Sequence, residues 1–198
     1  MKIYAYYQSI PTADQAEEFA CANWWKTSWT ANGWEPVMLN RSHAQGSTLY
    51  NKLQQKLAQS GIGHQWLQAR VAWFHARFSR WCALHAAGGG WMSDYDVLNM
   101  GLTPAMAKPS SEKTLLINNG PAYLVYATKD HCANAIKKFL LEDLTEDGKV
   151  RFEFDILNAE QKFGTLLEHV NHVHSRGNRS RSVRMQDIFN DKTEDLSE

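Results

Sequence analysis

Two aspartates, Asp94 and Asp96, have the type and spacing that most directly predict chemistry in this sequence. They end an apolar stretch that follows a glycine-rich turn, in residues 88–97 with the sequence GGGWMSDYDV. Carboxylate oxygens suit hard cations such as Mg²⁺ or Mn²⁺, and an ion held by one or two carboxylates completes its coordination with substrate phosphates and water. The pair therefore predicts a metal site that takes a phosphate-bearing substrate.

The surroundings of the pair favour this interpretation over a solvated loop, where two acids one residue apart also occur by chance. In an extended segment, Asp94 and Asp96 lie on one side while Tyr95 and Val97 pack on the other. The preceding glycines let the backbone turn sharply and approach a ligand closely.

The elements before the pair predict an α/β fold with a mostly parallel central sheet flanked by helices. Residues 2–8 are typical of a strand, 12–30 of a helix with a capping box at Thr12 and Gln15, and 34–39 of a second strand. Helices are expected over 47–60 and 65–87. The longer one places Arg70, Arg77 and Arg80 on one face and ends at three glycines.

The elements after the pair are expected to alternate in the same way. Strands are predicted over 114–117, 123–127 and 152–157, and helices over 129–142 and 159–170. Residues 174–184 are basic, and 191–198 form a polar tail expected to fray. We therefore expect one domain over residues 1–190.

Bulk composition supports a single globular domain without a strong electrostatic partner. The chain has 198 residues, 43% hydrophobic, and its 21 basic residues equal its 21 acidic ones, which argues against binding nucleic acid. Three widely spaced cysteines predict buried thiols in a reducing compartment. With neither a signal peptide nor a transmembrane segment evident, we expect a soluble, intracellular, cytoplasmic protein.

Three chain segments are expected to meet at the site, because ligands of open α/β sheets bind beyond the carboxyl ends of the strands. They are the end of the first strand (Tyr6, Tyr7, Gln8), the end of the second (Asn40), and the Asp94–Asp96 segment. Together they predict a site for a base, a ribose and a metal-bound diphosphate. Tyr6 or Tyr7 could stack on the base, and packing into the core is an equal alternative for each.

Residues 77–97, RFSRWCALHAAGGGWMSDYDV, resemble the signature of GT-A fold glycosyltransferases with a DXD sugar-binding motif, in particular the family 32-like group. That signature is an arginine on an apolar helix, a Gly-Gly turn, an aromatic residue and Asp-x-Asp. Residues 3–11 and 33–44 also resemble the first two strands of the group. The resemblance covers the first half of the chain and fades after Pro104.

The resemblance implies a single-domain GT-A (Rossmann-like) catalytic fold and a role for each matching residue. Asp96 would bind the metal directly, and Asp94 would contact the ribose or sugar of the donor and share the ion. Tyr95 lies between them and would contribute to donor binding. Either Arg77 or Arg80 would contact the donor, with a structural ion pair as the alternative.

The resemblance also implies that the C-terminal segment closes the site, with His174 as a metal ligand and Arg176 on the diphosphate. For the acceptor, the residues that could orient or deprotonate a hydroxyl are Asp130, His131, Glu153 and Asp155, and the sequence does not choose among them.

The function implied is a metal-dependent, hexosyltransferase-type glycosyltransferase with Mn²⁺ or Mg²⁺. It would move sugar from a UDP- or GDP-sugar donor to a glycan or glycoconjugate acceptor, with retention weakly favoured. A nucleotidyltransferase or phosphohydrolase would need more acids for a two-metal site. A carbohydrate- or nucleic-acid-binding module would use the eight tryptophans and the basic tail, but most of these tryptophans lie in expected helices and suit a core.

Overall fold

The computed structural model describes residues 1–9, 15–60, 68–107, 115–118, 123–146, 149–151, 153–157 and 170–172. Several expectations fall outside the described residues. These are the cap at Thr12, nearly all of the helix over 159–170, the site residues His174 and Arg176, the basic segment, and the tail that defines the end of the expected domain.

The centre of the fold is a five-stranded sheet in the order β2-β1-β3-β6-β5. Strand β1 pairs in parallel with β2 and β3, whereas β6 pairs antiparallel with both β3 and β5. The strand bounds are Lys2–Tyr6 (β1), Glu35–Leu39 (β2), Gly89–Ser93 (β3), Leu115–Asn118 (β5) and Tyr123–Thr128 (β6).

The α/β class is confirmed, but the sheet is mixed, and the expectation of a mostly parallel sheet needs correction. Only four residues separate β5 from β6. A connection that short joins antiparallel neighbours, because a parallel crossover requires a dozen or more residues. The parallel part of the sheet is therefore β2, β1 and β3, which come from the first half of the chain.

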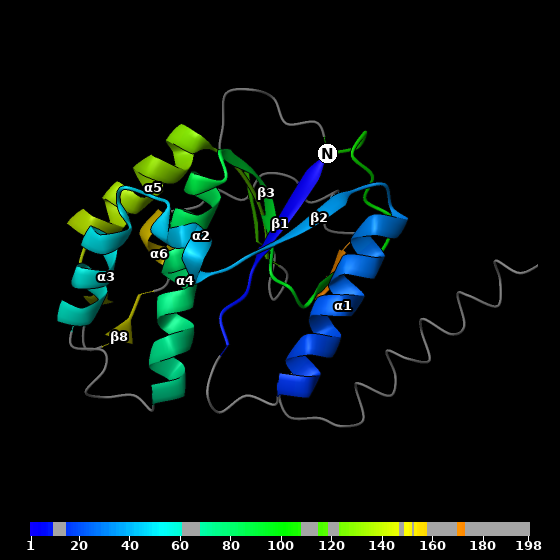
Figure 1. The fold of residues 1–198 in the computed structure, drawn as a ribbon. Helices are drawn as coiled ribbons and strands as arrows, with labels where there is room; N and C mark the ends of the chain where they lie inside the picture. Colours follow the sequence, from blue (N-terminus) through cyan, green and yellow to red (C-terminus); the bar gives the residue numbers. More distant parts are fainter. Residues whose placement is uncertain are drawn as a thin grey trace, which may run out of the picture.

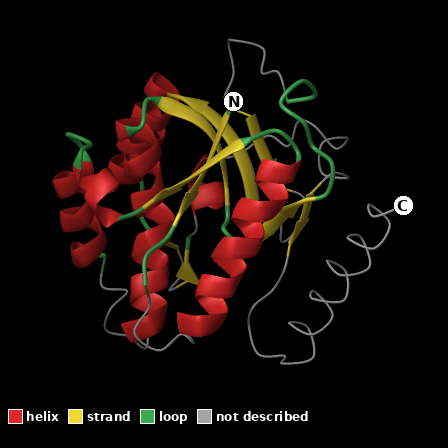
Figure 2. Ribbon diagram, turned by 45° about the vertical axis from the view of Figure 1, so that its right-hand side comes forward, coloured by secondary structure: helices red, strands yellow, loops and turns green. Residues whose placement is uncertain are grey.

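Helices cover both faces of the sheet, as Figures 1 and 2 show. Helix α1 lies on one face, and α2, α3, α4 and α5 lie on the other, where α4 contacts α2, α3 and α5. Their bounds are Gln15–Ala31 (α1), Arg41–Gln45 (α2), Tyr50–Gln59 (α3), Gln68–Ala86 (α4) and Lys129–Leu141 (α5).

Alternation along β1 divides the core into two clusters. Tyr4 and Tyr6 pack in the cluster on the α4 side, and Ile3 and Ala5 pack in the cluster on the α1 side. Side chains of a strand point alternately to the two faces, so a strand covered on both faces is apolar throughout. The α1-side cluster contains buried Trp25, Trp29, Trp34 and Trp91.

The second half of the chain contains the main error in the expected elements. Residues 152–157 were expected to form a strand, but Glu153–Leu157 form helix α6. Glu153 and Ile156 are both buried, and they lie three positions apart, which is helical spacing. The apolar run is too short for its periodicity to distinguish helix from strand.

Two small sheets complete the described fold. Strand β4 (Val97–Asn99) pairs antiparallel with β9 (Val170–His172), and β7 (Thr145–Glu146) pairs with β8 (Lys149–Val150). Val170, expected at the end of a helix, thus begins a strand. Among the described residues, none of the helices has the length and apolar character needed to cross a membrane.

Candidate functional site

The carboxyl ends of β1, β2 and β3 meet at one edge of the sheet because the three strands run in parallel. Tyr7 follows β1, Asn40 follows β2, and Asp94 follows β3. This edge is the lower one in Figure 1. The structure therefore brings together the three segments that the sequence placed at the site.

The Asp94–Asp96 segment forms a tight turn between β3 and β4. The backbone N–H of Val97 donates to the carbonyl oxygen of Asp94 at 3.1 Å. The segment is therefore not extended, and the alternation that would place both carboxylates on one side of a strand does not apply. The Asp94 side chain is 35% exposed, and Asp96 is half-buried. Both carboxylates belong to one turn at the site edge.

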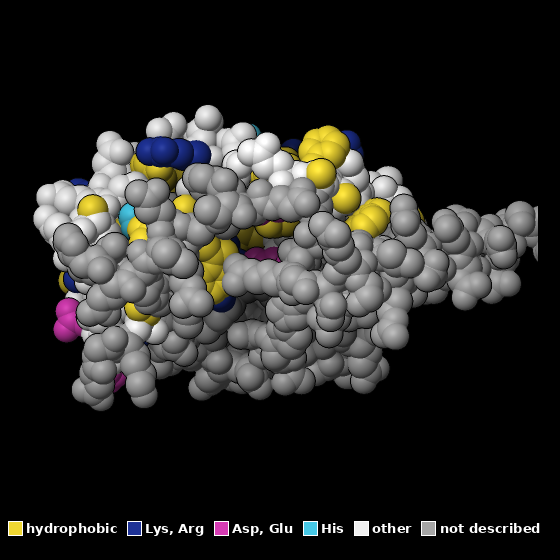
Figure 3. Space-filling view, turned by 90° about the horizontal axis from the view of Figure 1, so that it is seen from below, with side chains coloured by type: hydrophobic (Ala, Val, Ile, Leu, Met, Phe, Trp, Pro, Cys, Tyr) yellow, Lys and Arg dark blue, Asp and Glu magenta, His cyan; other side chains and the backbone are white. Residues whose placement is uncertain are grey.

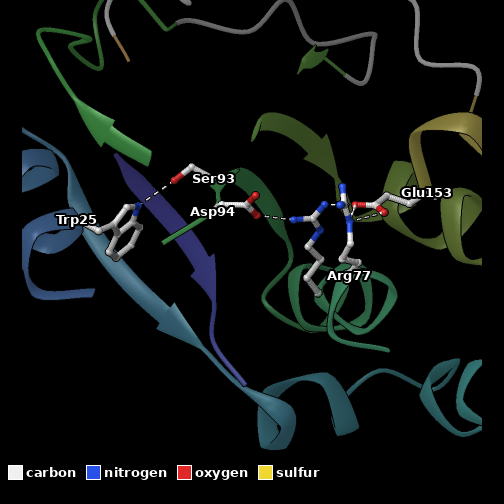
Figure 4. Close-up of polar contacts among 6 residues, drawn as sticks. Trp25, Arg77, Ser93, Asp94 and Glu153 are labelled. Atoms are coloured by element: carbon white, nitrogen blue, oxygen red, sulfur yellow. Dashed lines mark hydrogen bonds and ion pairs between the residues drawn. The ribbon is translucent and has the colours of Figure 1, made fainter. Parts of the chain in front are cut away.

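Arg80 of α4 connects this turn to the interior. Its Nη1 donates to Asp94 Oδ1 at 2.5 Å, and its Nη2 forms an ion pair with Glu153 of α6. Only 6% of the Arg80 side chain is exposed. Figure 4 shows these contacts joining the end of β3 to α6 through α4. Arg80 thus contacts the aspartate turn directly.

Arg77 lies one turn of α4 earlier and has different partners. Its Nε donates to both carboxylate oxygens of Glu153, at 3.1 and 3.0 Å, and its guanidinium carbon lies 4.8 Å from the centre of the Trp73 ring. Glu153 is completely buried. Arg77 therefore forms a buried ion pair with Glu153. A structural ion pair was the alternative to donor contact that the sequence left open for this residue.

The electrostatics of the turn suit a divalent cation. Burial raises the pKa of the Asp94 carboxyl, the nearby Arg80 guanidinium opposes this shift, and the negative charge of Asp96 raises the pKa further. A doubly charged ion between two such carboxylates would relieve their repulsion, and oxygen donors are the ligands that Mg²⁺ and Mn²⁺ prefer. The residues present therefore fit the expected ion.

The described residues contain no group of three or more His, Cys, Asp and Glu side chains arranged to hold a metal. A site with two carboxylates leaves coordination positions to substrate oxygens and water. His174, the expected third ligand, lies outside the described residues, as does Arg176.

A second polar cluster fixes the other side of the turn. The hydroxyl groups of Tyr7 and Tyr95 donate to the two oxygens of Glu18, at 3.0 and 3.3 Å, and the two rings meet edge to face with centres 5.5 Å apart. Burial and the Glu18 carboxylate raise the pKa of both phenols. Both phenols therefore stay neutral hydrogen-bond donors to Glu18.

Sequence reasoning missed Glu18, which is 6% exposed on α1. Nothing in its local spacing distinguishes it from a surface acid, because its partners lie 11 and 77 residues away. Its contacts with Tyr7 and Tyr95 depend on the packing of α1 beside the turn.

Of the two tyrosines considered for stacking on a base, Tyr6 packs into the core. Its side chain is 8% exposed, and its hydroxyl donates to Gln8 Oε1 at 3.0 Å. The Asn40 side chain caps α2, accepting hydrogen bonds from the backbone N–H groups of Ser42 and His43 at 3.0 and 3.3 Å. Tyr7 and Gln8 remain partly exposed at the site edge.

A pocket of about 330 Å³ opens between the end of β1 and helices α2, α3 and α4. Arg41 at its rim donates to the Tyr50 hydroxyl at 3.2 Å, and Gln54 donates to the buried Ser79 at 2.9 Å. Burial lowers the pKa of His75, so its imidazole is neutral at pH 7. The residues lining the pocket are Gln8, Arg41, Tyr50, Gln54, Val71, Ala72 and His75.

Figure 3 views the molecule from below and shows acidic side chains beside apolar ones near the middle of this face. Acidic groups next to apolar surface suit the binding of a ligand with a charged part and an apolar part.

Fold and site together define an α/β protein whose candidate site lies at the carboxyl edge of a mixed sheet, with two aspartates in a turn and a buried arginine behind them. The chain belongs to the family described as a domain of unknown function, DUF8765, whose family model matches residues 1–108. The match includes Arg80 and the aspartate turn but not Glu153. No curated protein and no solved structure matches the chain.

Proposed function

We propose that this protein is a metal-dependent glycosyltransferase with a GT-A fold, which moves a sugar from a UDP- or GDP-sugar to a hydroxyl group of a glycan or glycoconjugate. The observation that carries the proposal is the Asp94–Asp96 turn at the end of β3, backed by Arg80 at 2.5 Å from Asp94. It combines oxygen ligands for a cation with a fixed positive charge at the carboxyl edge of a sheet.

The pocket beside Gln8 supports the nucleotide part of this proposal. Its amide, neutral imidazole and guanidinium groups offer both donors and acceptors, and Val71 and Ala72 add apolar wall. Such a mixture suits a nucleoside, which has a flat ring with polar edges. Gln8, expected to bind the donor, lines this pocket, and Arg41 directly follows Asn40.

Breaking the bond between a sugar and a nucleoside diphosphate leaves negative charge on the departing diphosphate. A bound Mn²⁺ or Mg²⁺ would supply Lewis-acid stabilisation of that charge. The chain's own contribution is preorganisation: Arg80 and Glu153 hold Asp94, and Tyr95 is fixed on Glu18. Groups already oriented before the reaction need no rearrangement as charge develops.

Thermal-shift measurements test donor binding. A nucleotide sugar at 100 times its Kd should add about 2.7 kcal/mol of stability, roughly 5–10 °C in Tm for a chain of this size, and only with Mn²⁺ present. Stabilisation by an oligosaccharide or by RNA without metal would instead indicate a binding module.

Turnover tests the chemistry. Asp96→Asn should lower kcat roughly 10²–10³-fold with the fold intact, because a group that stabilises developing charge is lost. Asp143→Asn is the matched control, since Asp143 is exposed after α5. Full activity of Asp96→Asn would contradict the proposal, and release of phosphate or pyrophosphate instead of sugar would favour a phosphoryl- or nucleotidyl-transferring enzyme.

A further inference from the structure

Glu153 is an acid that a stable core does not require. Its side chain is fully buried, on a five-residue helix that begins 57 residues after Asp96. A buried charge is costly unless it is paired, and replacing a buried ion pair with apolar side chains is often neutral or stabilising. The presence of a charge here therefore points to a role beyond stability.

The contacts of Glu153 show what it does geometrically. It accepts from Nε of Arg77 and from Nη2 of Arg80, while Nη1 of Arg80 reaches Asp94. A guanidinium group is planar, so fixing one nitrogen on Glu153 fixes the direction of the other. Helix α6 thereby sets the position of the positive charge behind the aspartate turn.

We propose that Glu153 is a positioning residue that sets the cation affinity of the Asp94–Asp96 turn by acting through Arg80; this inference rests on the proposed function in treating that turn as a cation site. Arg80 and a divalent cation compete for the Asp94 carboxylate. Glu153 offsets part of the Arg80 charge and fixes the direction of its guanidinium group, so that Asp94 can share its carboxylate with the cation.

The charges of the cluster agree with this role. Arg77 and Arg80 supply two positive charges, and Asp94, Asp96 and Glu153 supply three negative ones. These five groups together carry one excess negative charge, so they attract a cation despite the arginine beside the turn. Without the charge of Glu153, Arg80 would act against Asp94 with its full charge, and this is the part of the effect that depends on Arg80.

A double-mutant cycle separates an effect through Arg80 from a direct effect of charge. The dissociation constant for Mn²⁺ is measured on metal-stripped full-length protein by the electron paramagnetic resonance signal of free Mn²⁺. Glu153→Gln should raise this constant roughly ten-fold, in the range of couplings between contacting charges, and Arg80→Gln should lower it. In the Arg80→Gln background, Glu153→Gln should change it less than about two-fold.

The opposite outcomes are equally distinct. An equal change in both backgrounds would mean that Glu153 acts by charge alone and would overturn the proposal, as would an unchanged constant in Glu153→Gln. The matched control is Glu142→Gln, which removes another arginine partner, that of Arg151 at 3.4 Å. It should leave the constant unchanged.

A measurement without metal separates failure of this inference from failure of the proposed function. Side-chain NMR of the metal-free protein should show resolved Nη–H signals for Arg80, assigned by their loss in Arg80→Gln. Glu153→Gln should merge or broaden them, and Glu142→Gln should not. If the wild type binds no Mn²⁺, the cation site fails, and with it the effect on cation affinity, while the spectra still decide whether Glu153 positions Arg80.

Should Glu153→Gln fail to fold, Glu153→Asp replaces it in both measurements. It keeps the charge but withdraws the carboxylate by one methylene group. The proposal expects weaker Mn²⁺ binding and altered Arg80 signals in this variant. Unchanged values of both would overturn it.

Discussion

Two neighbouring glycines at the start of β3, Gly88 just before it and Gly89 as its first residue, allow a matched test of how the strand is held. Gly88 and Gly89 both have positive φ, 94° and 86°, a region that residues with a Cβ atom rarely adopt. A Cβ added at Gly88 would meet nothing within 4 Å. A Cβ added at Gly89 would lie 2.5 Å from the carbonyl oxygen of Ala127 and 2.6 Å from the backbone nitrogen of Lys129.

The expected free energies of unfolding differ accordingly. Gly88→Ala should lose about 1–2 kcal/mol, the cost of a left-handed conformation for a residue with Cβ. Gly89→Ala carries the same cost and adds overpacking against backbone atoms that cannot rotate away, typically ~1–3 kcal/mol more. Because the free energy of unfolding of a folded domain is about 5–15 kcal/mol in total, the destabilisation by Gly89→Ala should be severe but measurable.

Urea unfolding followed by tryptophan fluorescence measures both variants, since Trp91 lies in β3 beside these glycines. The difference should appear in the midpoint with an unchanged slope, which indicates altered stability rather than an altered unfolded state. Equal destabilisation of Gly88→Ala and Gly89→Ala would refute the steric argument and the packing of β3 on β6 from which it comes.

Two further outcomes follow from buried titratable groups. Burial lowers the pKa of His75 from 6.5, so the unfolded chain binds more protons in the window below that value, and stability should fall as pH decreases from 7.5 to 5.5. His75→Gln should lose less stability between these two pH values in urea unfolding; equal losses would contradict the assignment. Burial raises the pKa of the Cys82 and Cys132 thiols to about 12, so both should resist a disulfide reagent at pH 8 until urea unfolds the chain. Rapid labelling of the native protein would show that these thiols are not enclosed as described.

Local patterns predicted most elements of the first half of the chain. The apolar spacing over residues 65–87 predicted α4, which is Gln68–Ala86, and the strand expected over 34–39 is β2, Glu35–Leu39. Burial of the three cysteines is confirmed. Such features depend on neighbours within a few residues, so periodicity alone carries the information.

Long-range contacts could not be read in the same way. The pairing of Arg80 with Glu153 joins residues 73 positions apart, and the sequence alone suggests Glu153 only as a residue that could orient or deprotonate an acceptor hydroxyl. The aspartate turn leads directly into β4, whose partner β9 lies near the end of the described chain. These contacts depend on how separate elements pack, which residue spacing does not encode.

The tryptophans show how the core and the candidate site depend on each other. Trp25 donates its indole N–H to Ser93 Oγ at 2.9 Å, and Trp29 donates to the carbonyl oxygen of Val97 at 3.0 Å. These two hydrogen bonds thereby anchor the residues immediately before and after the aspartate turn to α1. Trp34, which lies just before β2, donates to the carbonyl oxygen of Leu102 at 2.7 Å and anchors the chain after β4 in the same way.

All three indoles are buried, so water cannot replace the acceptors of their hydrogen bonds. Loss of one acceptor would leave a buried N–H group without a partner and would lower the free energy of unfolding by roughly 1–3 kcal/mol. The hydrogen bonds of Trp25 and Trp29 therefore fix the backbone on both sides of the two carboxylates. A carbohydrate-binding module would expose such rings, whereas Trp25, Trp29 and Trp34 are buried in the core and fix the chain on both sides of the turn. Asp94 and Asp96 thus occupy a turn clamped from α1 by indoles and from α4 by Arg80, and a cation bound there would meet ligands that are already in place.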